Sequence, residues 1–327
     1  MKVQRTLPTC IATVIFAFAG VACLSAQTTT YTLIAEPAQG LTPIYNLVTS
    51  ATKTIDMTMY ELDDTTMTSL LATAAADGVK VRVILDQNEE KSNNTTAYNY
   101  LAAHNVSVHW ANPVYTYTHQ KTITVDAATS AILTLNLTPR YYSTTRDYAV
   151  ITNDPADVAA IETTFAADFI NASITPPTGD NLVWSPTNSR SALEGIINGA
   201  TTSLMIEQEE MEDTGIEDAL EAALARGVAI TLVQENEDKD YNSILTTLKK
   251  DGAKIAVYTS STGYYIHAKV ILADYGTAEA KLFAGSENFS TNSLNNNREL
   301  GLIFSDATSM TAIDADILAD YNGGTKF

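Results

Sequence analysis

The sequence is poor in cysteine, which limits how the mature chain can be stabilised. Both cysteines of the 327 residues, Cys10 and Cys23, lie near the start. A basic beginning, an apolar run over 11–23 and a close on small residues are typical of a signal peptide. We therefore expect residues 1–26 to be removed on export, leaving a secreted or periplasmic protein with no disulfide and no cysteine metal site.

Basic residues and long apolar runs are also scarce. Without Lys2 and Arg5 of the predicted leader, 17 Lys and Arg residues stand against 38 Asp and Glu residues, a net charge of −21. Nucleic-acid binders usually carry a basic patch or stripe, and none is visible, so nucleic acid is not the expected partner. No later run approaches the roughly 20 apolar residues of a membrane span, so we expect a soluble mature protein.

What the sequence does contain is one pattern used twice, over residues 33–170 and 181–325. Each copy starts with an apolar strand, followed by an aspartate, a helix-like stretch, a glycine and a second apolar strand. Asp64 and Asp213 are 149 residues apart, and so are Gly78 and Gly227. A constant shift over such a distance indicates an internal duplication.

Both copies alternate β-branched apolar runs with alanine-rich amphipathic stretches, which predicts an α/β fold with largely buried sheets. Paired prolines and a glycine within residues 174–180 interrupt both patterns and indicate a linker. We expect two tandem homologous domains, residues 27–173 and 181–327, related by a pseudo-twofold axis. Two such domains meeting face to face place equivalent residues on either side of a shared cleft.

Two of the four histidines open the same string of residues. The strings His119–Asp126 and His267–Asp274 both read H-x-K-x-x-x-x-D, with a shift of 148 between them. Such a string seldom arises by chance, and two copies at equivalent places are far rarer. Both strings lead into apolar strands, where residues two apart face the same side, so each histidine and its lysine can contact one ligand.

A polar segment follows each string. In the second copy, Gly285 lets the backbone approach a phosphate, while Ser286 and Asn288 can donate hydrogen bonds to its oxygens. The first copy has donor groups at Thr134 and Asn136. We therefore expect a phosphate cradle in each half, and the first half lacks the glycine.

An acidic residue comes after each polar segment and could orient an imidazole. Asp147 and Glu299 are 152 residues apart, as are Asn136 and Asn288. Taken together, these residues resemble the paired HKD motifs of the phospholipase D superfamily. The second motif matches the family pattern throughout, whereas the first has Leu133 and Thr134 in place of Gly and Ser, and Asp147 in place of Glu.

The resemblance implies two phospholipase D-like domains, each a mostly buried mixed sheet flanked by helices, and a two-step displacement without metal or cofactor. It assigns His119 as the nucleophile and His267 as general acid and base, although the sequence alone does not orient the pair. The implied catalytic residues are His119, Lys121, Asp126, His267, Lys269 and Asp274, with the two aspartates as structural supports. The implied phosphate ligands are Lys121, Lys269, Thr134, Asn136, Gly285, Ser286 and Asn288, and Asp147 and Glu299 orient the histidines.

The resemblance leaves several functions open. The leading one is a monomeric phospholipase D that touches a membrane surface transiently and hydrolyses a phospholipid to phosphatidic acid and a free alcohol; another phosphodiester is also a possible substrate. The alternatives are an exported endonuclease, a phosphatidyltransferase and a non-catalytic phosphate-binding module. The acidic cluster from Glu207 to Asp213 is interpreted as a solvated or helix-initiating edge rather than a metal site.

Overall fold

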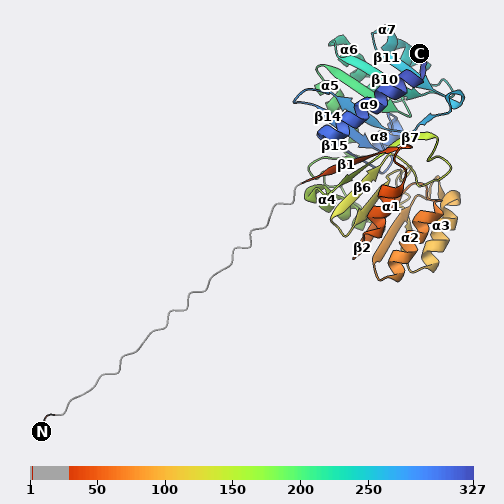
Figure 1. Cartoon of the computed structure of the whole chain (residues 1–327), viewed down its shortest axis with the longest axis vertical. Coiled ribbons are helices and arrows are strands. Elements are labelled where there is room, and N and C mark those ends of the chain that lie inside the picture. The colour runs from red at the N-terminus through yellow and green to blue at the C-terminus, as the bar shows by residue number, and fades with distance from the viewer. Residues whose placement is uncertain (1, 3–28) are drawn as a thin grey trace.

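The computed structural model describes Lys2 and residues 29–327, which form two halves stacked on one another (Figure 1). The predicted signal peptide, residues 1–26, lies outside the described residues apart from Lys2. The predicted linker, residues 174–180, lies between the halves and contains neither helix nor strand. Among residues 29–327, none of the helices has the length and apolarity needed to cross a membrane.

Each half contains a mixed sheet flanked by helices, which confirms the predicted fold class. The first half comprises β1 (Tyr31–Glu36), α1 (Thr42–Thr49), β2 (Thr54–Met59), α2 (Thr65–Ala76), β3 (Lys80–Leu85), α3 (Lys91–Ala103), β4 (Ser107–Trp110), β5 (Thr122–Val125), β6 (Thr129–Leu133), β7 (Thr145–Thr152) and α4 (Pro155–Phe169). The second comprises β8 (Leu182–Ser185), α5 (Ser189–Gly199), β9 (Ser203–Gln208), α6 (Thr214–Ala225), β10 (Ala229–Glu235), α7 (Asn242–Lys250), β11 (Lys254–Tyr258), β12 (Tyr265–Ile266), β13 (Val270–Ala273), β14 (Lys281–Gly285), α8 (Thr291–Asn295), β15 (Glu299–Phe304), α9 (Ala307–Gly323) and β16 (Thr325–Lys326).

The strand order demonstrates the duplication. The first sheet runs β1-β7-β6-β5-β2-β3-β4, and the second runs β8-β15-β14-β13-β9-β10-β11 with β16 added at its end. In both sheets the last three strands of this shared order are parallel to one another, and the others pair antiparallel. The HKD strings therefore enter equivalent central strands, β5 and β13.

Local signals in the sequence explain the helix that follows the first parallel strand in each half. The side chains of Asp64 and Asp213 accept hydrogen bonds from the first backbone amides of α2 and α6, as good N-caps do. The residues after these helices, Gly78 and Gly227, have φ angles of 93° and 88°, which glycine adopts without strain.

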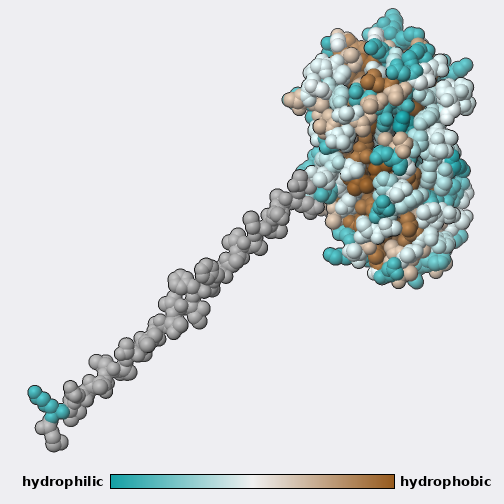
Figure 2. Space-filling model, in the orientation of Figure 1, coloured by the Kyte–Doolittle hydropathy of each residue, from teal (hydrophilic) through white to brown (hydrophobic). Residues whose placement is uncertain are grey.

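Three large apolar cores and one small cluster around Phe165 stabilise the described residues. One lies between the first sheet and α1–α3, and a second between the second sheet and α5–α8. The third is shared, because residues on the other faces of both sheets pack with α4 and α9. On the face seen in Figure 1, apolar residues run down the middle and hydrophilic residues cover both ends (Figure 2).

Strand pairing also crosses the boundary between the halves. The short β12 of the second half pairs in parallel with β7 of the first, with Ile266 opposite Arg146. The first half repeats the arrangement, since Thr118 forms a parallel bridge with Arg298. Each of these crossings joins the residue just before a motif histidine to the residue just before the acid of the other half.

Candidate active site

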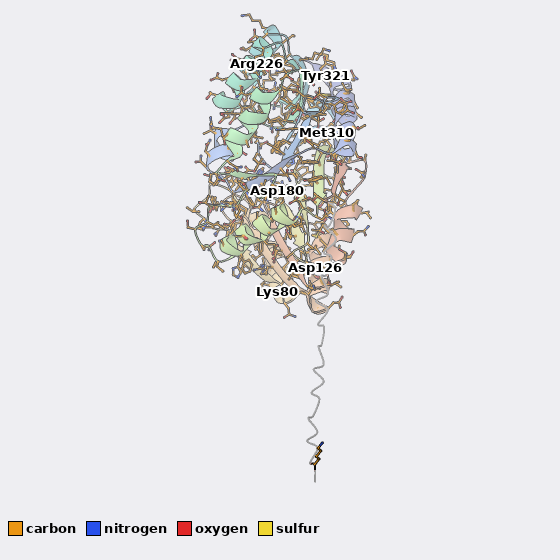
Figure 3. All side chains as sticks on the ribbon, turned by 90° about the vertical axis from the view of Figure 1, so that its left-hand side faces the viewer. Lys80, Asp126, Asp180, Arg226, Met310 and Tyr321 are labelled. Carbon is orange, nitrogen blue, oxygen red and sulfur yellow. The ribbon has the colours of Figure 1, made fainter. Side chains whose placement is uncertain are left out.

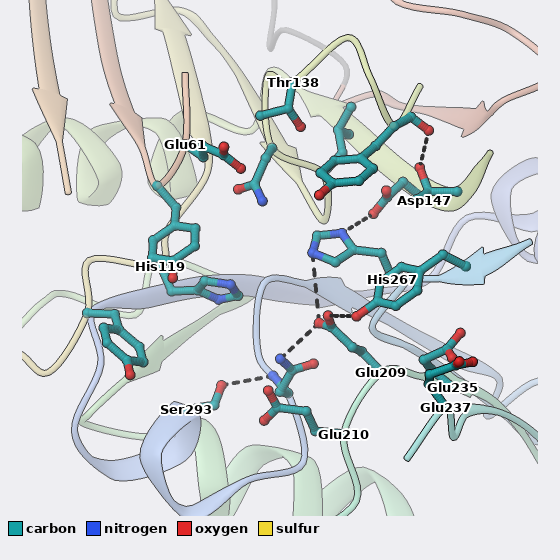
Figure 4. A pocket seen from close by; sticks show the side chains of 18 of the residues that line it. Glu61, His119, Thr138, Asp147, Glu209, Glu210, Glu235, Glu237, His267 and Ser293 are labelled. Carbon is teal, nitrogen blue, oxygen red and sulfur yellow. Dashed lines mark hydrogen bonds and ion pairs between the residues drawn. The ribbon is translucent and has the colours of Figure 1, made fainter. Parts of the chain in front are cut away.

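A cavity of about 880 Å³ lies between the two halves and is lined by residues of both. His119, three residues before the start of β5, and His267, between β12 and β13, both line it. Figure 4 shows the two imidazoles projecting into this cavity from its opposite sides. The structure therefore brings the two HKD motifs to one site, as the shared-cleft prediction requires.

Each histidine is held by an acid of the opposite half. Nδ1 of His119 lies 2.8 Å from Oε2 of Glu299, and Nδ1 of His267 lies 2.8 Å from Oδ1 of Asp147. A carboxylate at Nδ1 favours the tautomer that carries its proton there, which leaves Nε2 free to react. The crossing follows from the strand pairing, because the bridges between halves align each histidine with the distant acid.

The two motif lysines are fully buried behind the histidines and do not line the cavity surface. Lys121 Nζ donates a hydrogen bond of 2.6 Å to the carbonyl of His119, and Lys269 Nζ donates to the carbonyl of His267. Lys269 also forms an ion pair of 2.7 Å with Glu209. Both ammonium groups therefore support the loop of their own histidine as well as supplying positive charge to the site.

Of the predicted phosphate ligands, Asn136 and Asn288 line the cavity. Thr134 and Ser286 do not, and for them the structure corrects the prediction. Thr134 donates a hydrogen bond of 2.6 Å to Asp147 and accepts one from a backbone amide of β7. The hydroxyl of Ser286 accepts a hydrogen bond from the backbone amide of Leu300. These hydroxyls are already engaged in holding β7 and β15 in place.

Gly285 also has a different role from the predicted one. A Cβ atom built on it would lie 2.4 Å from Cα of Gly301 and 2.4 Å from a carboxylate oxygen of Glu287. Real Cβ atoms do not approach so closely, so the glycine is required by the packing of β14 against β15. Gly285 does not line the cavity, and its smallness serves that strand contact rather than a phosphate.

Asp126 and Asp274, which end the two strings, also lie away from the cavity. Asp126 accepts hydrogen bonds from the backbone amides of residues 52–54, and Asp274 does the same for residues 201–203. Figure 3 shows Asp126 at the outer end of the first half, near Lys80. Both aspartates fix the loop that enters the neighbouring strand, and neither is positioned to touch a substrate, so they have a structural role and not a catalytic one.

The sequence interpretation missed Glu209. Its Oε2 lies 2.7 Å from Lys269 Nζ, 3.1 Å from Nδ2 of Asn288 and 3.8 Å from Nε2 of His267. Glu207, in the same acidic cluster, is fully buried and accepts a hydrogen bond of 3.0 Å from Tyr148. The cluster is thus not a solvated edge, although Asp213 does initiate α6 as expected.

Burial changes the ionisation of the first motif. It lowers the pKa of His119 below its ordinary 6.5, although the carboxylate of Glu299 acts in the opposite direction. Burial also outweighs Glu299 at Lys121 and lowers its pKa to about 7. Burial opposes the ionisation of Glu299 itself, but His119 and Lys121 outweigh it and keep the pKa of Glu299 below its usual value. The first half therefore presents a neutral imidazole beside a carboxylate.

A second set of crossed contacts braces the site and was also missed. Arg146 pairs with Asp320 of α9 at 2.6 Å, and Arg298 pairs with Asp168 of α4 at 2.9 Å. Both arginines directly precede the acids that hold the histidines. Arg298 follows Arg146 by 152 residues, and Asp168 precedes Asp320 by the same distance. The repeat therefore contained a signal for both pairs.

Comparison with known proteins gives the same assignment as the geometry. A family model described as "Cardiolipin synthase, PLD-like domain" matches residues 44–169 and again residues 193–321. These two matches cover most of the chain. The chain belongs to the phospholipase D superfamily. No curated protein sequence matches it.

Solved structures share the two-domain fold of this phospholipase D-like chain. Phosphatidylserine synthase from Haemophilus influenzae has a TM-score of 0.70 at 10% identity, over 91% of this chain and 87% of that one. Polyphosphate kinase from Porphyromonas gingivalis also has a TM-score of 0.70, at 16% identity, over 89% of this chain. The chain spans only half the length of the kinase, 50%. At these identities the likeness concerns the fold.

Proposed function

We propose that this phospholipase D-like protein is a metal-independent phosphodiesterase that hydrolyses phospholipids to phosphatidic acid and a free head-group alcohol. One observation carries the proposal: two imidazoles in one cavity each present Nε2 while an acid of the opposite half holds Nδ1. Two such groups can divide nucleophilic attack and proton transfer between them.

In the first step, Nε2 of neutral His119 attacks phosphorus and the bond from phosphorus to the head-group oxygen breaks. The lowered pKa of His119, caused by its burial, supports its role as the nucleophile. His267 lies between the carboxylates of Asp147 and Glu209, and in its protonated form it can give its Nε2 proton to the departing alcohol. Lys121 and Lys269 compensate the charge that develops on the phosphoryl oxygens.

In the second step, His267 takes a proton from water, and the resulting hydroxide attacks phosphorus. The bond between phosphorus and His119 breaks, which releases the phosphate monoester and restores both histidines. Asn136 and Asn288 can donate hydrogen bonds to the phosphoryl oxygens from opposite sides of the cavity throughout both steps. Every proton and bond is then accounted for by these residues, the substrate and water.

The lining of the cavity favours a lipid head group over a nucleic acid. Nine carboxylate side chains line it, against one arginine and two histidines. Burial raises the pKa of Glu210 and of Glu235 to about 7, so these two are only partly ionised at neutral pH. The remaining negative charge still repels a polyanion, whose binding depends on phosphate neutralisation by basic residues. A neutral or cationic alcohol suits such walls.

The test is a side-by-side assay in EDTA of choline release from phosphatidylcholine vesicles and nicking of supercoiled plasmid. We expect choline release with intact plasmid. Nicking without choline release would overturn the proposal in favour of the endonuclease. No activity in either assay would favour the non-catalytic phosphate-binding module. Adding glycerol distinguishes the phosphatidyltransferase, which would yield phosphatidylglycerol and no phosphatidic acid.

We also propose that the chain is exported after removal of residues 1–26 and acts as a monomer. The leader pattern supports export, and the presence of both motifs in one chain supports a site that needs no second copy. N-terminal sequencing of the secreted protein and its mass in solution test both points. An uncleaved N-terminus, or a dimer as the only active species, would overturn them.

A further inference from the structure

Glu209 occupies contacts that the proposed reaction reserves for phosphate. It follows β9 and lines the cavity, where Figure 4 shows its carboxylate facing the imidazole of His267. Its Oε2 lies 2.7 Å from the ammonium of Lys269 and 3.1 Å from the amide nitrogen of Asn288. Burial opposes ionisation, but Lys269 and His267 outweigh it, so the pKa of Glu209 is below its usual value. The group is thus an anion held by two phosphate ligands.

The first half has no such anion. The residue that precedes Glu209 by the repeat distance of 149 is Tyr60, whose ring lies 5.0 Å from Lys121 Nζ and 4.7 Å from the ring of His119. Among the described residues, Lys121 forms no ion pair within 4.0 Å. The lysine of the second half is therefore paired with a carboxylate from within the chain, and the lysine of the first half is not.

We propose that Glu209 makes the site selective for phosphate diesters over phosphate monoesters. This inference rests on the phosphate site of the proposed function and deepens it. A diester carries one negative charge, whereas a monoester carries two above its second pKa of about 6. A fixed carboxylate beside the phosphate repels the second charge, so the monoester product is bound less well than the diester substrate.

The carboxylate of Glu209 has a further hydrogen-bond partner, which can hold it when a diester displaces it from Lys269 and Asn288. Its Oε1 accepts a hydrogen bond of 2.6 Å from the hydroxyl of Tyr265, at the rim of the cavity on β12. When phosphate oxygens take over Lys269 and Asn288, Glu209 can remain bound to Tyr265 and stay close enough to repel. Glu209 can therefore make room for the diester without a movement of the backbone.

The experiment measures binding of methyl phosphate and dimethyl phosphate to the mature protein by calorimetry at pH 8. Comparing variants by the ratio of the two affinities cancels the contribution of the additional methyl group. In Glu209→Gln we expect the preference for the diester to fall by about tenfold, mainly through tighter binding of the monoester. Glu212→Gln removes a charge from the cavity rim without touching Lys269, and its ratio should change by less than about threefold.

An unchanged ratio in folded Glu209→Gln would overturn the inference. A second measurement compares the pH dependence of binding in the wild-type protein and in Glu209→Gln: between pH 5 and pH 8 methyl phosphate gains its second charge while dimethyl phosphate does not. The preference for the diester should rise across this range in both proteins, because the pKa values of Lys121, Glu210 and Glu235 also lie near 7. The rise should be smaller in Glu209→Gln, and an equal rise in the two proteins would also overturn the inference. Neither measurement requires turnover, so a protein without diesterase activity would disprove the proposed function and leave this test intact.

Discussion

Asp147 Oδ1 lies 2.8 Å from Nδ1 of His267, although one residue belongs to the first half of the molecule and the other to the second. The same relation holds in reverse for Glu299 and His119. Each reacting imidazole therefore depends on the relative position of the two halves. Disturbing either acid or the packing between the halves should disturb the proposed chemistry.

The first prediction concerns the histidines. His119→Asn and His267→Asn should each lower kcat for choline release by on the order of 10⁴-fold, because each removes a group that forms or breaks a bond with the substrate. His104→Asn changes an exposed histidine directly after α3, outside the cavity lining, and should retain wild-type activity. Circular dichroism checks that all three fold. Substantial activity in both motif variants would reject the two-histidine mechanism.

The second prediction concerns the acids that hold the histidines. Asp147→Asn and Glu299→Gln keep the shape of the side chain but remove the charge that fixes the imidazole tautomer. We expect kcat to fall by about 10²- to 10⁴-fold with little change in KM, since substrate contacts are retained. Steady-state kinetics measure the split. A rise in KM with unchanged kcat would show that these acids bind substrate and do not position the histidines.

Only part of this arrangement could be predicted from the sequence. The repeat distances identified both histidines and both acids, because a duplication keeps equivalent residues at nearly constant shifts, here 148 and 152 residues. They could not show that Asp147 holds His267, since that depends on β12 pairing with β7 across the boundary. Such pairing of two-residue segments leaves no periodic pattern in the sequence.

Glu209 shows a different limit. It breaks the repeat, because its counterpart is Tyr60, and it lies in a run of acidic residues that resembles a solvated edge. Only the structure shows that β9 ends beside Lys269. Conversely, Thr134 and Ser286 matched a phosphate-binding pattern, yet their hydroxyls hold strands together. A donor group in a motif has several possible partners, and packing decides among them.

The third prediction follows from the ionisation of the first motif. His119 must be neutral to attack, so kcat/KM should fall as the pH drops through its pKa, which burial places below 6.5. Burial lowers the pKa of Lys121 to about 7, and above that pH the lysine loses the charge that binds phosphate. A bell-shaped profile of kcat/KM should result.

The alkaline limb of that profile can be assigned with one variant. Lys121→Arg keeps its charge at all accessible pH values, so the limb near pH 7 should move to higher pH. If the arginine is too large for this buried position, Lys121→Met should instead lower kcat/KM and remove the limb. An alkaline limb that stays in place in a folded Lys121→Arg protein would show that another group is responsible.

The fourth prediction separates Asp126 and Asp274 from the chemistry. Asp274→Ala removes the acceptor of three consecutive backbone amides and should lower the free energy of unfolding by about 1–3 kcal/mol. The kcat of the folded fraction should stay close to wild type, which urea denaturation and kinetics at low temperature can establish. A loss of kcat without a loss of stability would return this aspartate to the active site.

Asp126 adds a pH signature to the same prediction. Although burial opposes it, hydrogen bonds from Thr52, Thr54 and Lys53 lower the pKa of Asp126 to about 2. A lowered folded-state pKa gives a stabilisation that is complete above the unfolded value of about 3.9 and is lost as the pH falls toward 2. In Asp126→Ala, stability should therefore depend less on pH over this interval than in the wild-type protein.

The last prediction concerns the paired arginines at the boundary between the halves. Asp320→Ala leaves Arg146 buried without its main partner and should destabilise the protein by about 3–5 kcal/mol, softened by Asp316 at 3.8 Å. Asp314→Ala, on the same helix and without an ion pair among the described residues, should cost much less. Because Arg146 directly precedes Asp147, the loosened β7 should also reduce kcat in the folded fraction of Asp320→Ala. Replacing both partners, as in Arg146→Met with Asp320→Leu, should recover most of the stability in urea denaturation, since it leaves only the partly exposed Asp316 without its cation. If the double variant is as unstable as Asp320→Ala, the pair contributes through shape and not through charge.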